Sequence, residues 1–235
     1  MILDNMLRAV ALHLPKMHNH QFNLGLHNNT LPCEIFAKFL EQDIIYLREY
    51  ALAIKKLASR LEQPDHRRLF EQIHTQVLLE QRNLKHNYLP NIQISGSFFV
   101  ADRSINMTMP VVANYIAYLQ MQVKTAHVAS AVASLLPCFY IYSELGRSTN
   151  QNEIQANNRY YKWLASYSNA DFLLTTKSFI NVMNELSFGL SRYQKKSMVC
   201  AFVESTNFEI AFWDSVVSEC YFEKNLQQTF PSKIG

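Results

Sequence analysis

Apolar residues recur every three or four positions along most of this chain, and this spacing constrains the fold more than any other feature. Between positions 35 and 57 the repeat consists of Phe36, Leu40, Leu47, Tyr50, Ile54 and Leu57. A period near 3.6 residues places such side chains on one face of an α-helix, where they can be buried together. We therefore predict a long amphipathic helix over 35–57 that begins just after Pro32, because proline suits a helix start.

Similar patterns predict further helices. They are expected at the N-terminus and over residues 64–89, 110–123, 127–145, 158–167, 170–190 and 194–222. Proline suits the first turn of a helix and glycine the position after its last turn, so Pro110 is expected to open one helix and Gly146 to end another. The stretches 90–109 and 147–158 are predicted to be connections.

Turn-forming residues are scarce, with 5 glycines and 7 prolines among 235 residues. An all-β sandwich needs many tight turns, so this composition argues against one. Hydrophobic residues make up 49% of the chain, and the length suits a single core. We predict an all-α fold, a single-domain helical bundle over residues 1–225, with 226–235 as a C-terminal tail.

Charge and motif content exclude several classes of function. The net charge of +3 is too small and too dispersed for a nucleic-acid-binding surface, so no nucleic-acid partner is expected. The five glycines form neither G-x-G-x-x-G nor a P-loop. The four cysteines form no C-x-x-C pair, which leaves zinc ribbons and thioredoxin-like redox motifs unsupported.

The stretch 125–143 carries no formal charge and is long enough to cross a membrane. It also contains His127, Ser130, Ser134 and Pro137, and it is rich in alanine. A helix buried inside a bundle fits this composition better, so no membrane partner is expected. Asp4 and Arg8 interrupt the N-terminus, which therefore predicts an amphipathic helix rather than a signal peptide. We expect a cytoplasmic location with free thiols.

Polar residues that interrupt the apolar stripes are the candidates for chemistry. They are Asp43 in 35–57, Tyr115 in 110–123, Cys138 in 127–145 and Glu209 in 194–222. Each alone is more often structural, as a satisfied hydrogen-bond partner or a small hydrophobe. Together they predict a cavity for a flat, nitrogen-rich ring, in which aromatic faces stack, carboxylates bind ring nitrogens or amino groups, and a thiol attacks an electron-poor carbon.

Pro137 bears on the reactivity of this thiol. Proline lacks an N–H and therefore breaks a helical hydrogen bond. If the helix restarts there, the positive end of a helix dipole would favour a thiolate at Cys138. The alternative is that Pro137 only bends a helix around the core.

Several short motifs, in this order and spacing, resemble the thiaminase II family, also called TenA-type proteins. Residues 42–47 match Q-D-x-x-Y-L, residues 136–146 match L-P-C-x-x-x-Y-x-E-x-G, and residues 208–213 match Y-E-x-x-F-W. Weaker matches are His20-Gln21-Phe22 to H-P-F, residues 30–32 to the end of G-T-L-P, and Trp163 with Tyr167 to W-I-x-x-Y. Gln21 and Val111 depart from the family pattern, and the stretch 80–88 matches E-x-x-L-H poorly.

The resemblance implies a heme-oxygenase-like helical bundle, usually a homotetramer, without a metal or cofactor. It implies hydrolysis of 4-amino-5-aminomethyl-2-methylpyrimidine to the hydroxymethyl pyrimidine. Many members of the family also cleave thiamin itself. The implied role is salvage of the pyrimidine for thiamin synthesis. It assigns Cys138 as the nucleophile, Glu209 as the acid/base and Asp43 as a ligand for the polar edge of the substrate. It assigns four tyrosines to the pocket wall: Tyr46, Tyr115, Tyr142 and Tyr167.

Two rival interpretations remain open. A metal or haem protein on the same fold has weak support, because only one E-x-x-H element occurs, at Glu71 and His74, beside an H-x-H pair at His18 and His20. Haem would also need an axial ligand, for which His127 is one candidate. The second rival is a non-catalytic pyrimidine-binding protein that keeps the pocket.

Overall fold

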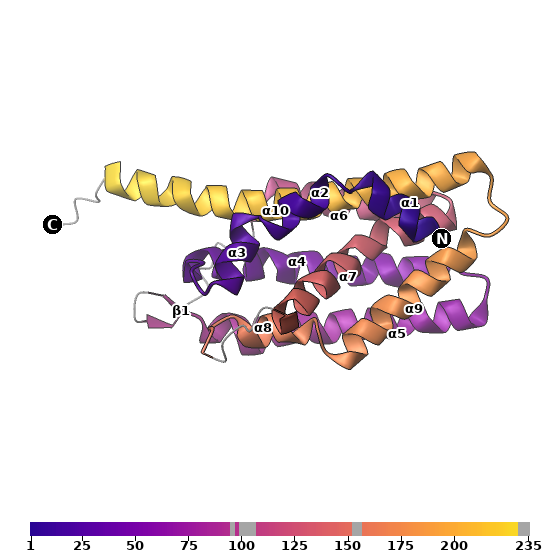
Figure 1. Ribbon diagram of the computed structural model, residues 1–235. Helices are drawn as coiled ribbons and strands as arrows, with labels where there is room; N and C mark the ends of the chain where they lie inside the picture. Colours follow the sequence, from indigo (N-terminus) through magenta and orange to yellow (C-terminus); the bar gives the residue numbers. More distant parts are fainter. Residues whose placement is uncertain (95–96, 99–106, 152–156, 230–235) are drawn as a thin grey trace.

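The computed structural model describes residues 1–94, 97–98, 107–151 and 157–229, which fold as an α-helical bundle (Figure 1). The first five helices are α1 (Ile2–Ala9), α2 (His13–His18), α3 (Gln21–His27), α4 (Cys33–Ala58) and α5 (Pro64–Asn83). The other five are α6 (Pro110–Thr125), α7 (Val128–Gln151), α8 (Tyr161–Ser166), α9 (Ala170–Leu186) and α10 (Arg192–Thr229). The all-α prediction is confirmed.

Short irregular elements follow α5. A π-helical turn η1 (Leu84–Tyr88) and a 3-10 turn η2 (Leu89–Asn91) continue its direction, so the predicted helix over 64–89 is α-helical only as far as Asn83. Two-residue strands β1 (Gln93–Ile94) and β2 (Ser97–Phe98) then pair antiparallel, with Gln93 opposite Phe98. These strands lie in the segment 90–109, which was predicted to be a connection without regular structure.

Helix α7 crosses the bundle obliquely, while α4, α5 and α10 run along its long axis (Figure 1). It packs against α10, α9, α6, α8 and α4, and residues 129–137 are all buried. Its alanines allow this close packing on every side. The segment Val128–Arg147 is long and apolar enough to cross a membrane, but 78% of it is buried inside the protein. That burial favours the predicted core helix.

Helix starts were predicted more accurately than helix ends. Pro32 precedes α4 and Pro110 opens α6, as expected. The prediction that Gly146 ends its helix is wrong, because α7 continues to Gln151 and takes in the first part of the expected loop 147–158. Residues 152–156 of that loop lie outside the described part of the chain. Helix α10 likewise extends to Thr229, so residues 226–229 are helical rather than part of a tail.

Gly146 has a packing role instead. A Cβ atom at this position would lie 2.5 Å from the carbonyl carbon of Tyr167 and 2.7 Å from the amide nitrogen of Ser168. Both are backbone atoms, which cannot turn aside as a flexible side chain can. The absence of a side chain at Gly146 therefore lets α7 approach the segment that follows α8, and it sets the position of Tyr167.

Gly146→Ala is expected to destabilise the protein by about 1–3 kcal/mol, since overpacking against backbone forces local shifts. In a helix, alanine alone would instead stabilise by about 0.5–1 kcal/mol relative to glycine. The sign of the change in unfolding free energy, measured by urea denaturation, thus separates the two effects. An increase in stability would contradict the packing role.

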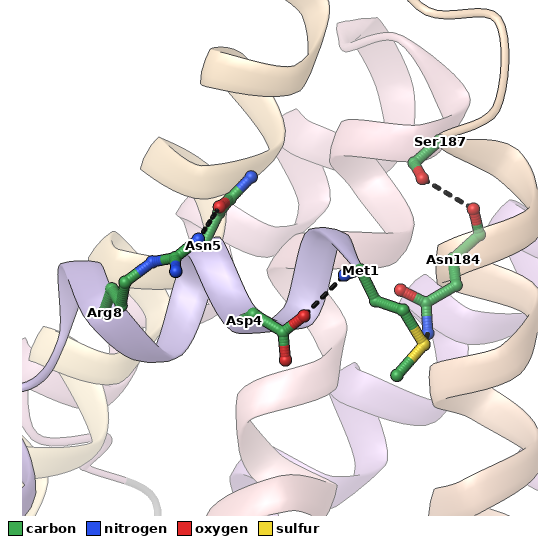
Figure 2. Close-up of polar contacts among 6 residues, drawn as sticks. All are labelled: Met1, Asp4, Asn5, Arg8, Asn184 and Ser187. Carbon is green, nitrogen blue, oxygen red and sulfur yellow. Dashed lines mark hydrogen bonds and ion pairs between the residues drawn. The ribbon is translucent and has the colours of Figure 1, made fainter.

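The N-terminal helix α1 packs against α9 and α10. It buries Ile2 and Met6 and exposes Asp4 and Arg8, which confirms the predicted amphipathic helix. Figure 2 shows how its first residue meets α9: the Asn184 amide donates to the Met1 sulfur at 3.6 Å.

Candidate active site

A cavity of about 520 Å³ lies between α4, α5 and α7 and the segment that joins α8 to α9. Its lining residues include Asp43, Tyr50, Glu80, Cys138, Tyr142 and Tyr167. Asp43 and the three tyrosines are buried, whereas Asn169 and Asp171, which also line the cavity, are exposed. The cavity therefore has a buried inner end that holds the thiol and a carboxylate, and an outer end at the surface.

The structure places the seven predicted site residues in two layers. Four of them line the cavity: Asp43, Cys138, Tyr142 and Tyr167. The other three lie beside it and are buried, namely Tyr46, Tyr115 and Glu209. The Tyr115 hydroxyl donates to Oε1 of Glu209 at 3.0 Å, and the rings of Tyr115 and Tyr46 stack with their centres 4.9 Å apart.

Helix α4 supplies Asp43 from a face that is tied to neighbouring elements. Asp43 and Tyr50 lie seven residues apart, which is two helical turns, and therefore face the cavity together. The Tyr50 hydroxyl donates to the carbonyl of Leu135 on α7 at 2.6 Å. Since this bond joins α4 to α7 one turn before Cys138, it helps to set the position of Asp43 relative to the thiol.

Gln42 explains why the Q-D pair of the motif matters. Its side-chain oxygen accepts from the Met109 amide at 2.8 Å, and its nitrogen donates to the Met107 carbonyl at 3.2 Å. These bonds hold the backbone that leads into α6, and α6 carries Tyr115. Gln42 thus positions the partner of Glu209, while the adjacent Asp43 faces the cavity.

Burial raises the pKa values of both inner carboxyls, and repulsion from other carboxylates adds to the rise at Asp43. Burial raises the pKa of Glu209 to about 8, although the hydrogen bond from Tyr115 opposes part of the rise. Burial also raises the pKa of Asp43 well above its usual range, and Glu209 and Glu80 add to the rise. A carboxyl that keeps its proton at neutral pH can act as a general acid.

The environment of Cys138 differs from the predicted one. Helix α7 runs through Pro137 without restarting, so no helix N-terminus lies at the thiol. Of the two alternatives for Pro137, a restart of the helix is therefore excluded. Burial raises the pKa of Cys138 well above that of a free thiol, Glu209 and Asp43 raise it further, and the nearby Tyr46 hydroxyl opposes part of the rise. The alternative of a dipole-stabilised thiolate is therefore wrong, because the helix does not restart at Pro137 and burial keeps the thiol protonated.

Aromatic rings form much of the cavity wall. Phe139 and Phe172 stack with an interplanar angle of 9° and centres 5.3 Å apart. Tyr142 and Tyr167 lie 5.0 Å apart, and Trp163 packs edge-on against Tyr167 at 5.0 Å. Flat apolar surfaces of this kind suit a planar heterocyclic ligand.

Sequence reasoning missed Glu80 as a residue of the site. Ile73, Val77 and Leu84 are buried on the same side of α5 and η1, and Glu80 falls into their three- and four-residue spacing. This is the signal that singled out Asp43 on α4. Glu80 was not predicted because its helix is polar overall. Phe139 and Phe172 were not predicted because an apolar repeat shows which residues are buried but not which of them border a cavity.

Three of the histidines considered as metal or haem ligands, His20, His74 and His127, have structural contacts. The imidazole of His20 accepts from the Phe22 amide at the start of α3 and contacts Asp214 of α10 at 3.1 Å. Nδ1 of His74 contacts the Ala51 carbonyl at 2.9 Å, and Nδ1 of His127 accepts from the Ala129 amide. Among the described residues, no group of three or more His, Cys, Asp or Glu side chains is placed to hold a metal ion.

The sequence profile of the TENA/THI-4/PQQC family matches residues 7–219. The chain belongs to this family. A curated relative from Halalkalibacterium halodurans is named aminopyrimidine aminohydrolase. It is 22% identical over 209 residues, which cover 88% of this chain and 92% of that protein.

Solved structures support the family fold. A TenA homologue from Pyrococcus furiosus superimposes with a TM-score of 0.80 at 17% identity, covering 92% of this chain and 100% of the other. A Shewanella denitrificans domain with a heme oxygenase-like fold gives 0.72 at 11% identity, covering 99% and 96%. This TENA/THI-4/PQQC family member thus has the heme-oxygenase-like bundle that the motifs predicted.

Proposed function

We propose that this protein is an aminopyrimidine aminohydrolase of thiamin salvage. Its substrate is 4-amino-5-aminomethyl-2-methylpyrimidine, and thiamin is proposed as a second substrate. The observation that carries the proposal is that one aromatic cavity brings the thiol of Cys138 and the carboxyl of Asp43 together, with Glu209 beside them. The relative from Halalkalibacterium halodurans carries the same activity in its name.

The cavity suits binding of the pyrimidine at its inner end. The ring would lie against the tyrosine and phenylalanine faces, which match its flat shape. Asp43 keeps a proton because its pKa is raised, so its carboxyl can donate to a ring nitrogen and accept from the adjacent amino group. We assign Asp43 to this edge and Tyr142 and Tyr167 to the walls.

The proposed reaction proceeds by covalent catalysis through Cys138. The sulfur adds to an electron-poor ring carbon, and the displaced electron pair moves to a ring nitrogen, which takes a proton from Glu209. The carboxylate formed at Glu209 takes the proton that the Cys138 thiol gives up, so Glu209 ends this step protonated. The exocyclic C–N bond then breaks, and its electron pair leaves with the nitrogen. Water adds to the exocyclic carbon, and the proton that it gives up leaves with the ammonia as ammonium. The ring nitrogen then loses its proton by way of Glu209 to the departing sulfur, which restores the aromatic ring and the thiol.

Tyr115 and Tyr46 would support the acid rather than contact the ring. Tyr115 holds one oxygen of Glu209, and Tyr46 packs on Tyr115 beside the thiol. We further propose that the protein is cytoplasmic and acts as a homotetramer without a metal or cofactor. Large apolar side chains that are exposed in the single chain, such as Phe188 and Tyr193, support burial between subunits.

Mass spectrometry of the products from a panel of aminopyrimidines and thiamin tests the proposed function. The expected result is conversion of the aminomethyl pyrimidine to the hydroxymethyl pyrimidine, with one ammonia released per turnover. Binding of the panel without turnover would instead support the non-catalytic rival. Stoichiometric iron or a haem absorption band in the purified protein would support the metal rival.

A further inference from the structure

The cavity is acidic and its lining carries no counter-charge. Three carboxyl groups line it, those of Asp43, Glu80 and Asp171, and its described lining includes no Lys, Arg or His. With Asp43 protonated, Glu80 and Asp171 still give this concave site one sign of charge, which attracts ligands of the opposite sign. Phosphorylated ligands are therefore disfavoured, and a ligand that carries a positive charge is favoured.

Glu80 has an oxygen without a partner. Asn83 donates to its Oε2 at 3.3 Å, but Oε1 is buried and accepts no hydrogen bond from any residue the structure describes. A buried carboxylate oxygen without a donor is unfavourable, so Oε1 of Glu80 points to a ligand that supplies the donor.

The two carboxyls lie on different helices of one cavity. Asp43 comes from α4 and Glu80 from α5. Burial raises the pKa values of Asp43 and Tyr167, and the charge of Glu80 adds to both rises. Asn83 and Gln76 flank Glu80 along α5 and also line the cavity. Glu80 is thus near enough to the inner residues to contact a substituent of a ring that Asp43 holds.

We propose that Glu80 is a specificity-determining residue that binds the positively charged aminomethyl group of the substrate. This inference rests on the proposed function and adds the recognition of the leaving group. An unpaired carboxylate oxygen accepts from an ammonium group, and the charge-assisted bond is stronger than one between neutral groups. A neutral substituent of the same size gains no such bond.

The charge also matters for the reaction. A group bound as ammonium leaves as neutral ammonia, because the electron pair of the broken C–N bond goes to a nitrogen that already carries three protons. A neutral amine would leave as an amide anion, which is a far poorer leaving group. By keeping the nitrogen protonated, Glu80 would favour departure of the amine as well as its binding.

Calorimetric titration with two pyrimidines of matched size tests the proposal. The aminomethyl pyrimidine is a cation at pH 7, and the hydroxymethyl pyrimidine is neutral. To prevent turnover, both are titrated into protein that carries Cys138→Ser, with and without Glu80→Gln. Glu80→Gln is expected to weaken binding of the cation by about tenfold and to change binding of the neutral ligand less than twofold.

Glu71→Gln is the matched control, because Glu71 is an exposed glutamate of the same helix that does not line this cavity. It should change neither affinity. In the active enzyme, Glu80→Gln should raise KM for the aminomethyl pyrimidine. Equal effects of Glu80→Gln on both ligands, or no effect on either, would overturn the proposal.

Failure of the proposed function is distinguishable from failure of this inference. If the protein binds neither pyrimidine, the proposed function fails, and benzylammonium and benzyl alcohol replace the pyrimidine pair. A preference for benzylammonium that Glu80→Gln removes would still support the cation subsite. The absence of such a preference would overturn it.

Discussion

Cys138→Ser is expected to reduce turnover of the aminomethyl pyrimidine by about 10³-fold or more, while binding and folding persist. A serine hydroxyl is a much weaker nucleophile than a thiol, and no side chain in the described cavity lining is a histidine that could activate it. The two side chains differ by one atom, so the cavity should keep its shape. The rate constant kcat follows from product mass spectrometry, the affinity from calorimetry, and the stability from thermal unfolding.

Cys200→Ser is the matched control for this experiment. Cys200 is a free, exposed cysteine on α10 and lies outside the cavity. Its replacement should leave turnover unchanged. If Cys138→Ser keeps turnover within tenfold of the wild type, sulfur is not the nucleophile and the covalent mechanism is wrong.

Glu209→Gln is expected to lower turnover by about 10²–10⁴-fold and to make the protein more stable at alkaline pH. Turnover falls because glutamine cannot supply the proton that the ring nitrogen needs. Stability changes because burial raises the pKa of Glu209 in the folded protein to about 8, from an ordinary value of 4.5. The folded protein therefore keeps a proton that the unfolded chain has already lost at neutral pH.

The sign of the pH dependence follows from this difference. Below about pH 4.5 both states hold the proton, and the stabilising contribution is complete. As pH rises towards 8 the contribution is lost, and unfolding free energy falls by up to about 1.4 kcal/mol per pH unit from this group. In urea denaturation between pH 5 and 9, the unfolding free energy should fall less steeply with pH in Glu209→Gln than in the wild type. The pH dependence that remains in the variant would come from Asp43, whose pKa is also raised.

Glu204→Gln provides the control, because Glu204 is exposed on the same helix. Its denaturation curves should follow the wild-type pH dependence. Identical slopes in the wild type and Glu209→Gln would show that Glu209 does not hold a proton in the folded protein. The role of general acid at neutral pH would then be withdrawn.

Local patterns in the sequence determined the helical architecture. A three- and four-residue apolar repeat reports which face of a helix is buried, and prolines mark helix starts, so α4 and α6 were predicted closely. The same repeat exposed Asp43, Cys138 and Glu209 as polar residues on buried faces. These signals depend on neighbours a few positions away, which is the range over which sequence alone is informative.

Tertiary packing decided what those residues experience. Gly146 was predicted to end a helix, but it lies inside α7, where the backbone of Tyr167 and Ser168 packs too closely for a side chain. A helix restart at Pro137 would have favoured a thiolate at Cys138, but α7 continues through this residue and burial between the helices keeps the thiol protonated. Burial and charge act through space, so the proton affinities of these groups, like the place of Glu80 in the cavity, depend on which helix faces meet.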